Sequence, residues 1–100
     1  MARTVVWSET AWHDLEQVAE YIAQDSRHYA AAFVREVRDA ARSLATFAER
    51  GRIVPELSDP AVRELFVGRY RLMYRLAEST VQIVAFVHGA RDFRGPQSAD

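Results

Sequence analysis

The chain contains no cysteine and no lysine among its 100 residues, and it has no apolar run long enough to cross a membrane. The absence of cysteine excludes disulfide frameworks, thiolate zinc sites and cysteine nucleophiles, and it fits a reducing compartment. The first residues, Met1 to Trp7, include Arg3 and lack the apolar core of a signal peptide. We therefore expect a cytoplasmic protein that does not associate with membranes.

Charge of either sign is not in large excess, because the formal net charge is -1. This balance argues against indiscriminate binding to nucleic acid, which requires a strongly basic surface. All 13 basic residues are arginine, a side chain that favours planar, bidentate recognition of phosphate or carboxylate. The three histidines are not spaced as metal ligands, and no glycine-rich phosphate loop is present, so we expect neither a metal nor a cofactor.

The hydrophobic content of 49% is enough for one modest core that needs neither disulfides nor metal. We expect a single domain over residues 1–95 and a disordered tail over residues 96–100.

Two amphipathic helices are predicted in the first half of the chain. Ser8 is a good helix start, and apolar residues recur at helical spacing from there to Ile22. Asp25 and Ser26 interrupt the pattern and can cap a second helix. Gly51 is expected to end this second helix as a left-handed C-terminal cap. The apolar stripe of the second helix comprises Tyr29, Phe33, Val37, Ala40, Ala41, Leu44 and Phe47.

The remaining segments are predicted strands, since β-branched and aromatic residues alternate with polar ones. A loop rich in proline covers residues 52–61, a tight turn lies near Gly68, and a two-residue turn lies at Glu78 and Ser79. The predicted strands are Arg3–Trp7, Val62–Val67, Arg69–Ala77 and Thr80–His88. The fold class is therefore α+β, in the order β-α-α-β-β-β: an N-terminal strand, an antiparallel helical hairpin, and a three-stranded antiparallel meander that completes one sheet. The first strand is most simply placed beside the last.

The turn at Glu78 and Ser79 predicts which residues share a face of the sheet. One face is apolar and suited to cover by the helices; it pairs Leu76, Tyr74, Leu72 and Tyr70 with Val81, Ile83, Ala85 and Val87. The other face pairs Arg75, Met73, Arg71 and Arg69 with Gln82, Val84, Phe86 and His88. An even-length turn at Gly68 adds Leu65 and Val67 to the apolar face and Val62, Glu64 and Phe66 to the arginine face.

The arginine face carries the candidate binding residues. Arg69, Arg71, Arg75 and His88 lie on it, and Arg91 and Arg94 extend a basic rim that suits a phosphate-bearing ligand. Alternatively, these arginines are solvated or paired, and Glu64 can lie across from Arg71 and neutralise it. His88 can serve as a general acid or base, or simply as a hydrogen-bonding residue.

The same face also contains apolar residues that need cover, because their exposure would favour aggregation. Phe93 from the tail, a second copy of the chain, or an external peptide can each supply it. The residues concerned are Val62, Phe66, Met73, Val84 and Phe86.

Four segments, in this order, resemble the ParE/RelE superfamily of toxins from type II toxin-antitoxin systems. They are VWSETAWHDLEQVAEYI (6–22), GRIVPEL (51–57), RELFVGRYRLMYRL (63–76) and VHGARDF (87–93). The resemblance extends from Val5 to Arg94, and it is closer to ParE-like members, which the HGARD ending at residues 88–92 favours. It implies a partner, a ParD-like or other antitoxin, whose C-terminal segment wraps the toxin surface and forms a hetero-oligomer with it. We expect the antitoxin to cover Phe66, Met73, Val84 and Phe86.

Activity divides this superfamily into two branches. ParE-like members poison DNA gyrase by binding it, whereas RelE-like members cleave messenger RNA in the ribosome. Arg71 and Arg91 match two arginines that RelE-like enzymes use for the phosphate, but the paired lysines of that pattern fall at Val62 and Glu64 and its closing tyrosine near Gln97. In a YoeB-like branch, a glutamate after proline and a late histidine are needed, which Glu56 and His88 approximate.

We therefore expect a gyrase inhibitor that is not an enzyme and binds its target through six basic residues: Arg69, Arg71, Arg75, His88, Arg91 and Arg94. The first alternative is a ribosome-dependent mRNA endonuclease that uses Glu56, Arg71, His88 and Arg91. The second is a toxin-derived module that has lost its activity and only binds a partner.

Overall fold

The computed structural model describes residues 2–91, which form two helices and one five-stranded sheet. The strand order is β1-β5-β4-β3-β2, with β1 parallel to β5 and the other pairs antiparallel. The elements are β1 (Thr4–Trp7), α1 (Glu9–Ala23), α2 (Arg27–Ser43), β2 (Arg52–Ile53), β3 (Val62–Val67), β4 (Tyr70–Leu76) and β5 (Thr80–His88). The predicted α+β class, the element order and the place of the first strand beside the last are confirmed. The short strand β2 lies in the segment predicted to be a loop. The expected tail at residues 96–100 lies outside the described residues.

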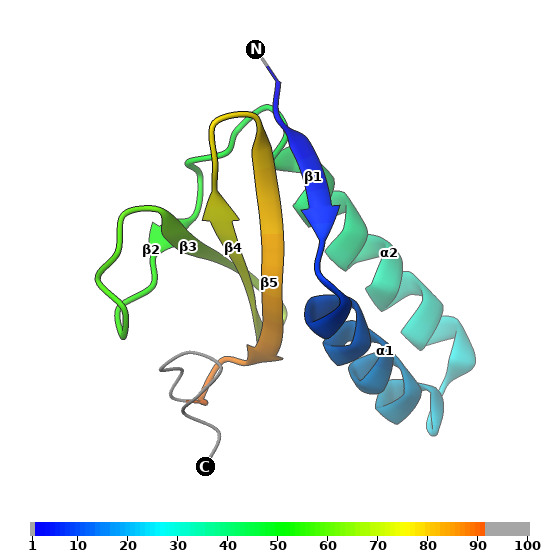
Figure 1. The fold of residues 1–100 in the computed structure, drawn as a ribbon. Coiled ribbons are helices and arrows are strands. Elements are labelled where there is room, and N and C mark those ends of the chain that lie inside the picture. Colours follow the sequence, from blue (N-terminus) through cyan, green and yellow to red (C-terminus); the bar gives the residue numbers. More distant parts are fainter. Residues whose placement is uncertain (1, 92–100) are drawn as a thin grey trace.

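Both helices begin where the sequence predicts. The hydroxyl oxygens of Ser8 and Ser26 accept hydrogen bonds of 3.0 Å from the amides of Ala11 and Tyr29, so each serine satisfies an N–H that the helix leaves unpaired. The two helices run side by side on one side of the sheet (Figure 1).

The predicted end of the second helix is wrong. Helix α2 ends at Ser43, and the φ angle of Gly51 is not positive. Among the described glycines, only Gly68 has a positive φ. Glycine is instead required at residue 51 because Tyr74 and Glu64 lie close to its backbone. A Cβ atom there would lie 2.5 Å from the hydroxyl of Tyr74 and 2.6 Å from the backbone oxygen of Glu64. No side chain fits at this position without a shift of the surrounding backbone.

The side of the sheet that faces the helices carries the larger core. Phe33, Val37, Ala41 and Leu44 are buried there, whereas Tyr29 and Phe47 of the predicted stripe are 63% and 64% exposed. Tyr29 lies in the first turn of α2 and Phe47 beyond its end, so neither reaches the sheet. The sheet contributes Val67, Leu72, Tyr74, Val81, Ile83 and Phe86 to this core.

The register between β4 and β5 is correct near the turn and wrong beyond it. Tyr74 pairs with Ile83 as predicted, but the preceding residue of β4, Met73, pairs with Ala85, because a bulge leaves Val84 of β5 without a partner in β4. Beyond the bulge every pair is shifted by one residue, so Arg71 pairs with Val87 and Tyr70 with His88. The shift moves Phe86 to the helical side of the sheet.

The far side of the sheet, opposite the helices, is covered by the chain itself. Val54 is buried, and Leu57 packs beside it, so the loop at residues 54–61 covers Met73 on this side. The buried members of this second, smaller core are Val54, Val62, Met73, Ala85 and Val87. Of the apolar residues expected to need an outside partner, Val62 and Met73 are thus buried beneath the loop at residues 54–61, which we call the middle loop, whereas Phe66 stays exposed.

Among residues 2–91, neither helix has the length and apolar character that spanning a bilayer demands.

Candidate functional site

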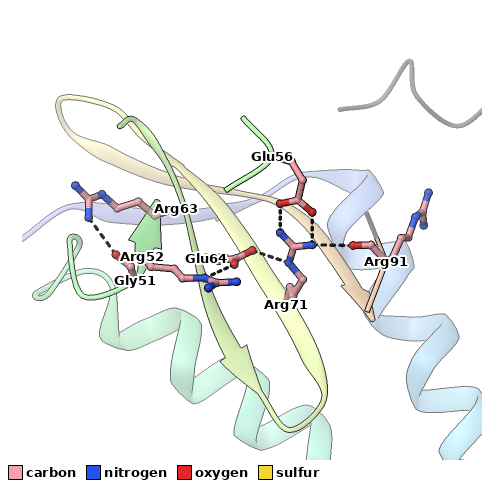
Figure 2. Close-up of polar contacts among 7 residues, drawn as sticks. All are labelled: Gly51, Arg52, Glu56, Arg63, Glu64, Arg71 and Arg91. Carbon is pink, nitrogen blue, oxygen red and sulfur yellow. Dashed lines mark hydrogen bonds and ion pairs between the residues drawn. The ribbon is translucent and has the colours of Figure 1, made fainter. Parts of the chain in front are cut away.

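Arg71 lies at the centre of a cluster of charged residues on the far side of the sheet (Figure 2). Its Nε atom donates to Glu64 at 2.6 Å, and its two terminal nitrogens donate to the two carboxylate oxygens of Glu56 at 2.8 and 2.7 Å. Nη1 also donates to the backbone oxygen of Arg91 at 2.7 Å. Arg71 therefore joins β3, the middle loop and the segment after β5.

Glu64 is shared between two arginines. Its Oε1 atom accepts from Arg71, and its Oε2 atom accepts from Nε of Arg52 at 2.6 Å. Strand β2 makes the second contact possible, because Arg52 is the direct partner of Glu64 in the pairing of β2 with β3. The predicted neutralisation of Arg71 by Glu64 is confirmed, while the contribution of Arg52 was missed.

Burial makes these contacts matter for stability. The side chains of Arg71 and Glu64 are 3% and 0% exposed, and that of Glu56 is 14% exposed. A buried charge without a partner is strongly destabilising, so each of these groups depends on the others. The hydrogen bonds to Glu56, together with the smaller contribution of Glu64, raise the pKa of Arg71 despite the opposing effect of burial. The side chains of Arg52, Arg71, Glu56 and Glu64 form the cluster, and their two positive and two negative charges make it neutral.

The cluster leaves Arg71 little capacity for a ligand. A guanidinium has five N–H donors, and four hydrogen bonds of Arg71 already go to Glu64, Glu56 and Arg91. Glu56 occupies the two-nitrogen edge that a phosphate would use. A phosphate can reach Arg71 only if Glu56 first moves away.

The structure brings three of the predicted binding residues together at one end of the sheet. Tyr70 pairs with His88, the amide of Gly89 donates to the backbone oxygen of Arg69, and the amide of Arg91 donates to the backbone oxygen of His88. We call the exposed residues Arg69, His88 and Arg91 the basic rim. The ring of His88 contacts Tyr70 with centroids 5.5 Å apart, and its Nδ1 atom accepts from the amide of Ala90 at 3.1 Å.

Two other predicted binding residues are not part of this arrangement. Arg75 lies toward the other end of β4, half exposed, with Nη1 3.7 Å from a carboxylate oxygen of Asp59. Arg94 and the candidate cover Phe93 lie outside the described residues.

The residues expected to contact an antitoxin are divided between surface and interior. Phe66 is 53% exposed, with the guanidinium carbon of Arg52 5.3 Å from its ring centre, and Val84 is half-buried. Met73 and Phe86 are buried within the chain and present no surface. Phe86 is interior because of the bulge at Val84, and Met73 because of the loop that covers it.

Within the part of the chain that the structure describes, no three histidine, aspartate or glutamate side chains are grouped to hold a metal ion. The charged cluster is held together by arginine instead.

Comparisons with known proteins agree with this fold. Residues 5–93 match the family described as the ParE toxin of type II toxin-antitoxin systems, parDE. Toxin RelE2 of Caulobacter vibrioides is 39% identical over 88 residues, which cover 87% of this chain and 96% of the relative. A solved structure described as the chromosomal ParDE system from P. aeruginosa has the same fold, with a TM-score of 0.72 and 20% identity over 87% of this chain and 96% of that one. The chain therefore belongs to the ParE toxin family of type II toxin-antitoxin systems.

Proposed function

We propose that this toxin inhibits DNA gyrase by binding it and that it does not cut RNA. Membership of a type II toxin-antitoxin family implies an antitoxin partner. Gyrase is the target of ParE-like members of the superfamily that the sequence resembles. The observation that carries the proposal is the state of Arg71, which is buried and bound to two carboxylates.

Cleavage of RNA requires a base for the 2′-hydroxyl, a cation for the charged phosphate and an acid for the leaving oxygen. Arg71 and Glu56, the candidate cation and base, are bonded to each other through both carboxylate oxygens. Neither is free to meet a substrate in this arrangement. Inhibition by binding needs only an exposed surface, which the basic rim and the neighbouring Phe66 provide.

Phe66 and the basic rim form one continuous surface. A Cβ atom on Gly89 would lie 3.0 Å from the ring of Phe66, so the ring packs against the backbone between His88 and Arg91. An exposed aromatic ring beside arginines is typical of the anchor residues in protein interfaces. We expect Arg69, Arg91 and Phe66 to contact the target.

The test is a supercoiling assay with purified gyrase and toxin. The wild-type toxin should block supercoiling, and Arg69→Glu and Arg91→Glu should each weaken the inhibition about tenfold or more, as loss of a well-placed interface charge does. Arg27→Glu, an equal charge change at the start of α2, is the matched control and should inhibit normally. Normal supercoiling at wild-type toxin concentrations that stop growth contradicts the proposal.

One observation favours the endonuclease as a second candidate. Glu56, Arg71 and the backbone of Arg91 are in direct contact, and His88 bonds to Arg91 through its backbone, so the four proposed catalytic residues lie at the same end of the sheet. Toeprinting on a translating message distinguishes the two candidates. Cuts at the ribosomal A site that vanish in Glu56→Gln indicate the endonuclease, whereas an uncut message together with gyrase inhibition supports the proposal. A toxin that stops no growth but still binds its antitoxin indicates the inactive module.

A further inference from the structure

The segment after β5 leads from the end of the sheet to Arg91, one of the residues expected to contact the target. The amide of Gly89 donates to the backbone oxygen of Arg69 at 2.7 Å, and the amide of Arg91 donates to the backbone oxygen of His88 at 3.0 Å. The backbone oxygen of Arg91 is held separately, by Nη1 of Arg71 at 2.7 Å. A side chain from the middle of the sheet thus fixes the carbonyl of a residue in the basic rim.

A fixed carbonyl also restricts the side chain of the same residue, because the carbonyl carbon and Cβ are bonded to one Cα atom at nearly constant angles. In Figure 2 the carbonyl oxygen of Arg91 points into the charged cluster, while its side chain points away from the cluster. Without the bond from Arg71, rotation about the backbone of Arg91 would turn this side chain in other directions. The direction in which Arg91 leaves the rim therefore depends on Arg71.

Arg71 itself is too deeply buried to meet the target. Its side chain is 3% exposed, and Glu56 covers its two terminal nitrogens with hydrogen bonds of 2.8 and 2.7 Å. A carboxylate bonded to both nitrogens fixes the plane of a guanidinium. With the plane fixed in this way, Nη1 also reaches the oxygen of Arg91. The middle loop therefore orients Arg71, and Arg71 orients Arg91.

Stability alone does not account for an arginine at this buried position. Apolar residues of similar volume often replace a buried charged cluster without loss of stability. They offer no donor to a carbonyl, whereas a guanidinium has five donors in one plane. Arg71 uses these donors to bind Glu64, Glu56 and the backbone of Arg91 at the same time. The number and direction of its donors are what this arrangement requires.

We propose that Arg71 is a positioning residue for target binding. It holds the backbone of Arg91 so that the Arg91 side chain projects from the basic rim, and Glu56 keeps Arg71 in the required orientation. Neither Arg71 nor Glu56 touches the target. The inference rests on the proposed function, in which the rim binds gyrase, and it replaces the direct role predicted for Arg71 with an indirect one.

Hydrogen exchange in the free toxin tests the positioning without gyrase. Arg71→Lys keeps the charge but lacks the planar set of donors. The matched control is Arg63→Lys, because Arg63 donates from Nη1 to the backbone oxygen of Gly51 at 3.0 Å and so holds a different segment. We expect the amide of Arg91 to exchange about tenfold faster in Arg71→Lys, the effect of one lost bond from a charged donor, and at the wild-type rate in the control. Equal exchange at Arg91 in the two variants overturns the proposal.

A double-mutant cycle shows whether Arg71 acts through Arg91. Dissociation constants for purified gyrase are measured for wild type, Arg71→Lys, Arg91→Ala and the combined variant. We expect Arg71→Lys to weaken binding about fivefold in the wild-type background and less than about twofold in the Arg91→Ala background, where the side chain that it positions is already gone. Combined with Arg69→Ala, the two effects should multiply. A smaller folded fraction would instead weaken binding equally in every background.

Glu56→Gln is the second variant, because lysine at the buried position can reduce the folded fraction. Glutamine has one side-chain oxygen and so accepts from only one of the two terminal nitrogens. Binding to gyrase should weaken about threefold, and this loss should disappear in the Arg91→Ala background. A loss that is equal in both backgrounds, for either variant, overturns the proposal. Wild-type toxin that does not bind gyrase contradicts the proposed function instead, and exchange at Arg91 then still decides whether Arg71 positions it.

Discussion

The two sides of the sheet bury adjacent residues of one strand in different ways. Leu72 points toward the helices and is surrounded by apolar side chains, while Arg71 points to the other side and is held by Glu56 and Glu64. Both residues are almost completely buried. The apolar side needs only shape and volume to be matched, whereas the charged side needs each partner in place. The charged side is therefore the one that a single substitution should damage most.

The largest effect is expected from Arg71→Met. Methionine fills a similar volume, but it leaves Arg52 as the one cation bonded to the buried Glu64 among the described residues, and it removes the two hydrogen bonds from Arg71 to Glu56. We expect a loss of about 3 to 5 kcal/mol in the free energy of unfolding, measured by urea denaturation. Arg69→Met, at an exposed position two residues earlier, should change it by less than about 0.5 kcal/mol.

A double variant separates lost pairing from lost packing on the charged side. Arg71→Met/Glu64→Leu removes both buried charges, so we expect it to be about 1 to 2 kcal/mol more stable than Arg71→Met alone. A double variant that is less stable than the single one shows that the cluster holds the loop at residues 54–61 in place through more than charge compensation.

Leu72→Ala tests the apolar side of the same strand. Leu72 is completely buried, and its truncation leaves a cavity between the sheet and the helices. We expect a loss of about 3 kcal/mol in the free energy of unfolding, also from urea denaturation. A loss larger than that of Arg71→Met reverses the comparison between the two sides.

Tyr74→Phe is expected to have a smaller effect, because it removes one polar contact from the apolar side. The Tyr74 hydroxyl accepts a 2.9 Å hydrogen bond from the amide of Gly51, and burial raises the pKa of this hydroxyl. Phenylalanine keeps the ring and leaves the buried amide without its acceptor. We expect a loss of about 1 to 2 kcal/mol and faster hydrogen exchange at Gly51. Tyr21→Phe, at an exposed ring on α1, is the control and should be neutral.

The sequence predicts much of the fold because local signals determine it. Ser8 and Ser26 are visible as helix caps, and the turn at Glu78 fixes the register of the β4–β5 hairpin as far as Tyr74. The bulge at Val84 could not be predicted, because the alternation of residue types continues through it and only the packing of Phe86 against Tyr70 and Phe33 distinguishes the shifted register. One inserted residue thus moves an aromatic ring from one side of the sheet to the other.

The candidate site is predictable in part. The pairing of Glu64 with Arg71 follows from the turn at Gly68, which places both on one face. The bond from Arg52 does not follow from any pattern, because a two-residue strand carries no periodicity. Nor does sequence spacing show that the loop would fold back to bring Glu56 onto Arg71, which is the contact that decides between a free and an occupied arginine.

The smallest effect is expected at Asp14, where the apolar side of the sheet meets a charge. Its Oδ2 atom accepts from the amide of Phe86 at 3.2 Å, and burial raises its pKa more than this bond and the charges of His13 and Arg91 lower it. A raised pKa means that the folded protein binds the proton more tightly than the unfolded chain, so the Asp14 contribution to stability is lost as the pH rises through the folded pKa.

Asp14→Asn resembles the protonated form at every pH. We expect it to unfold at a slightly higher temperature than wild type at neutral pH and at nearly the same temperature once the pH is below the ordinary aspartate pKa of 3.8. Asp25→Asn, at an exposed position between the helices, should show no such convergence. A variant less stable than wild type at neutral pH shows instead that the ionised carboxylate stabilises the edge of β5, and that even the apolar side of this sheet depends on a specific charge.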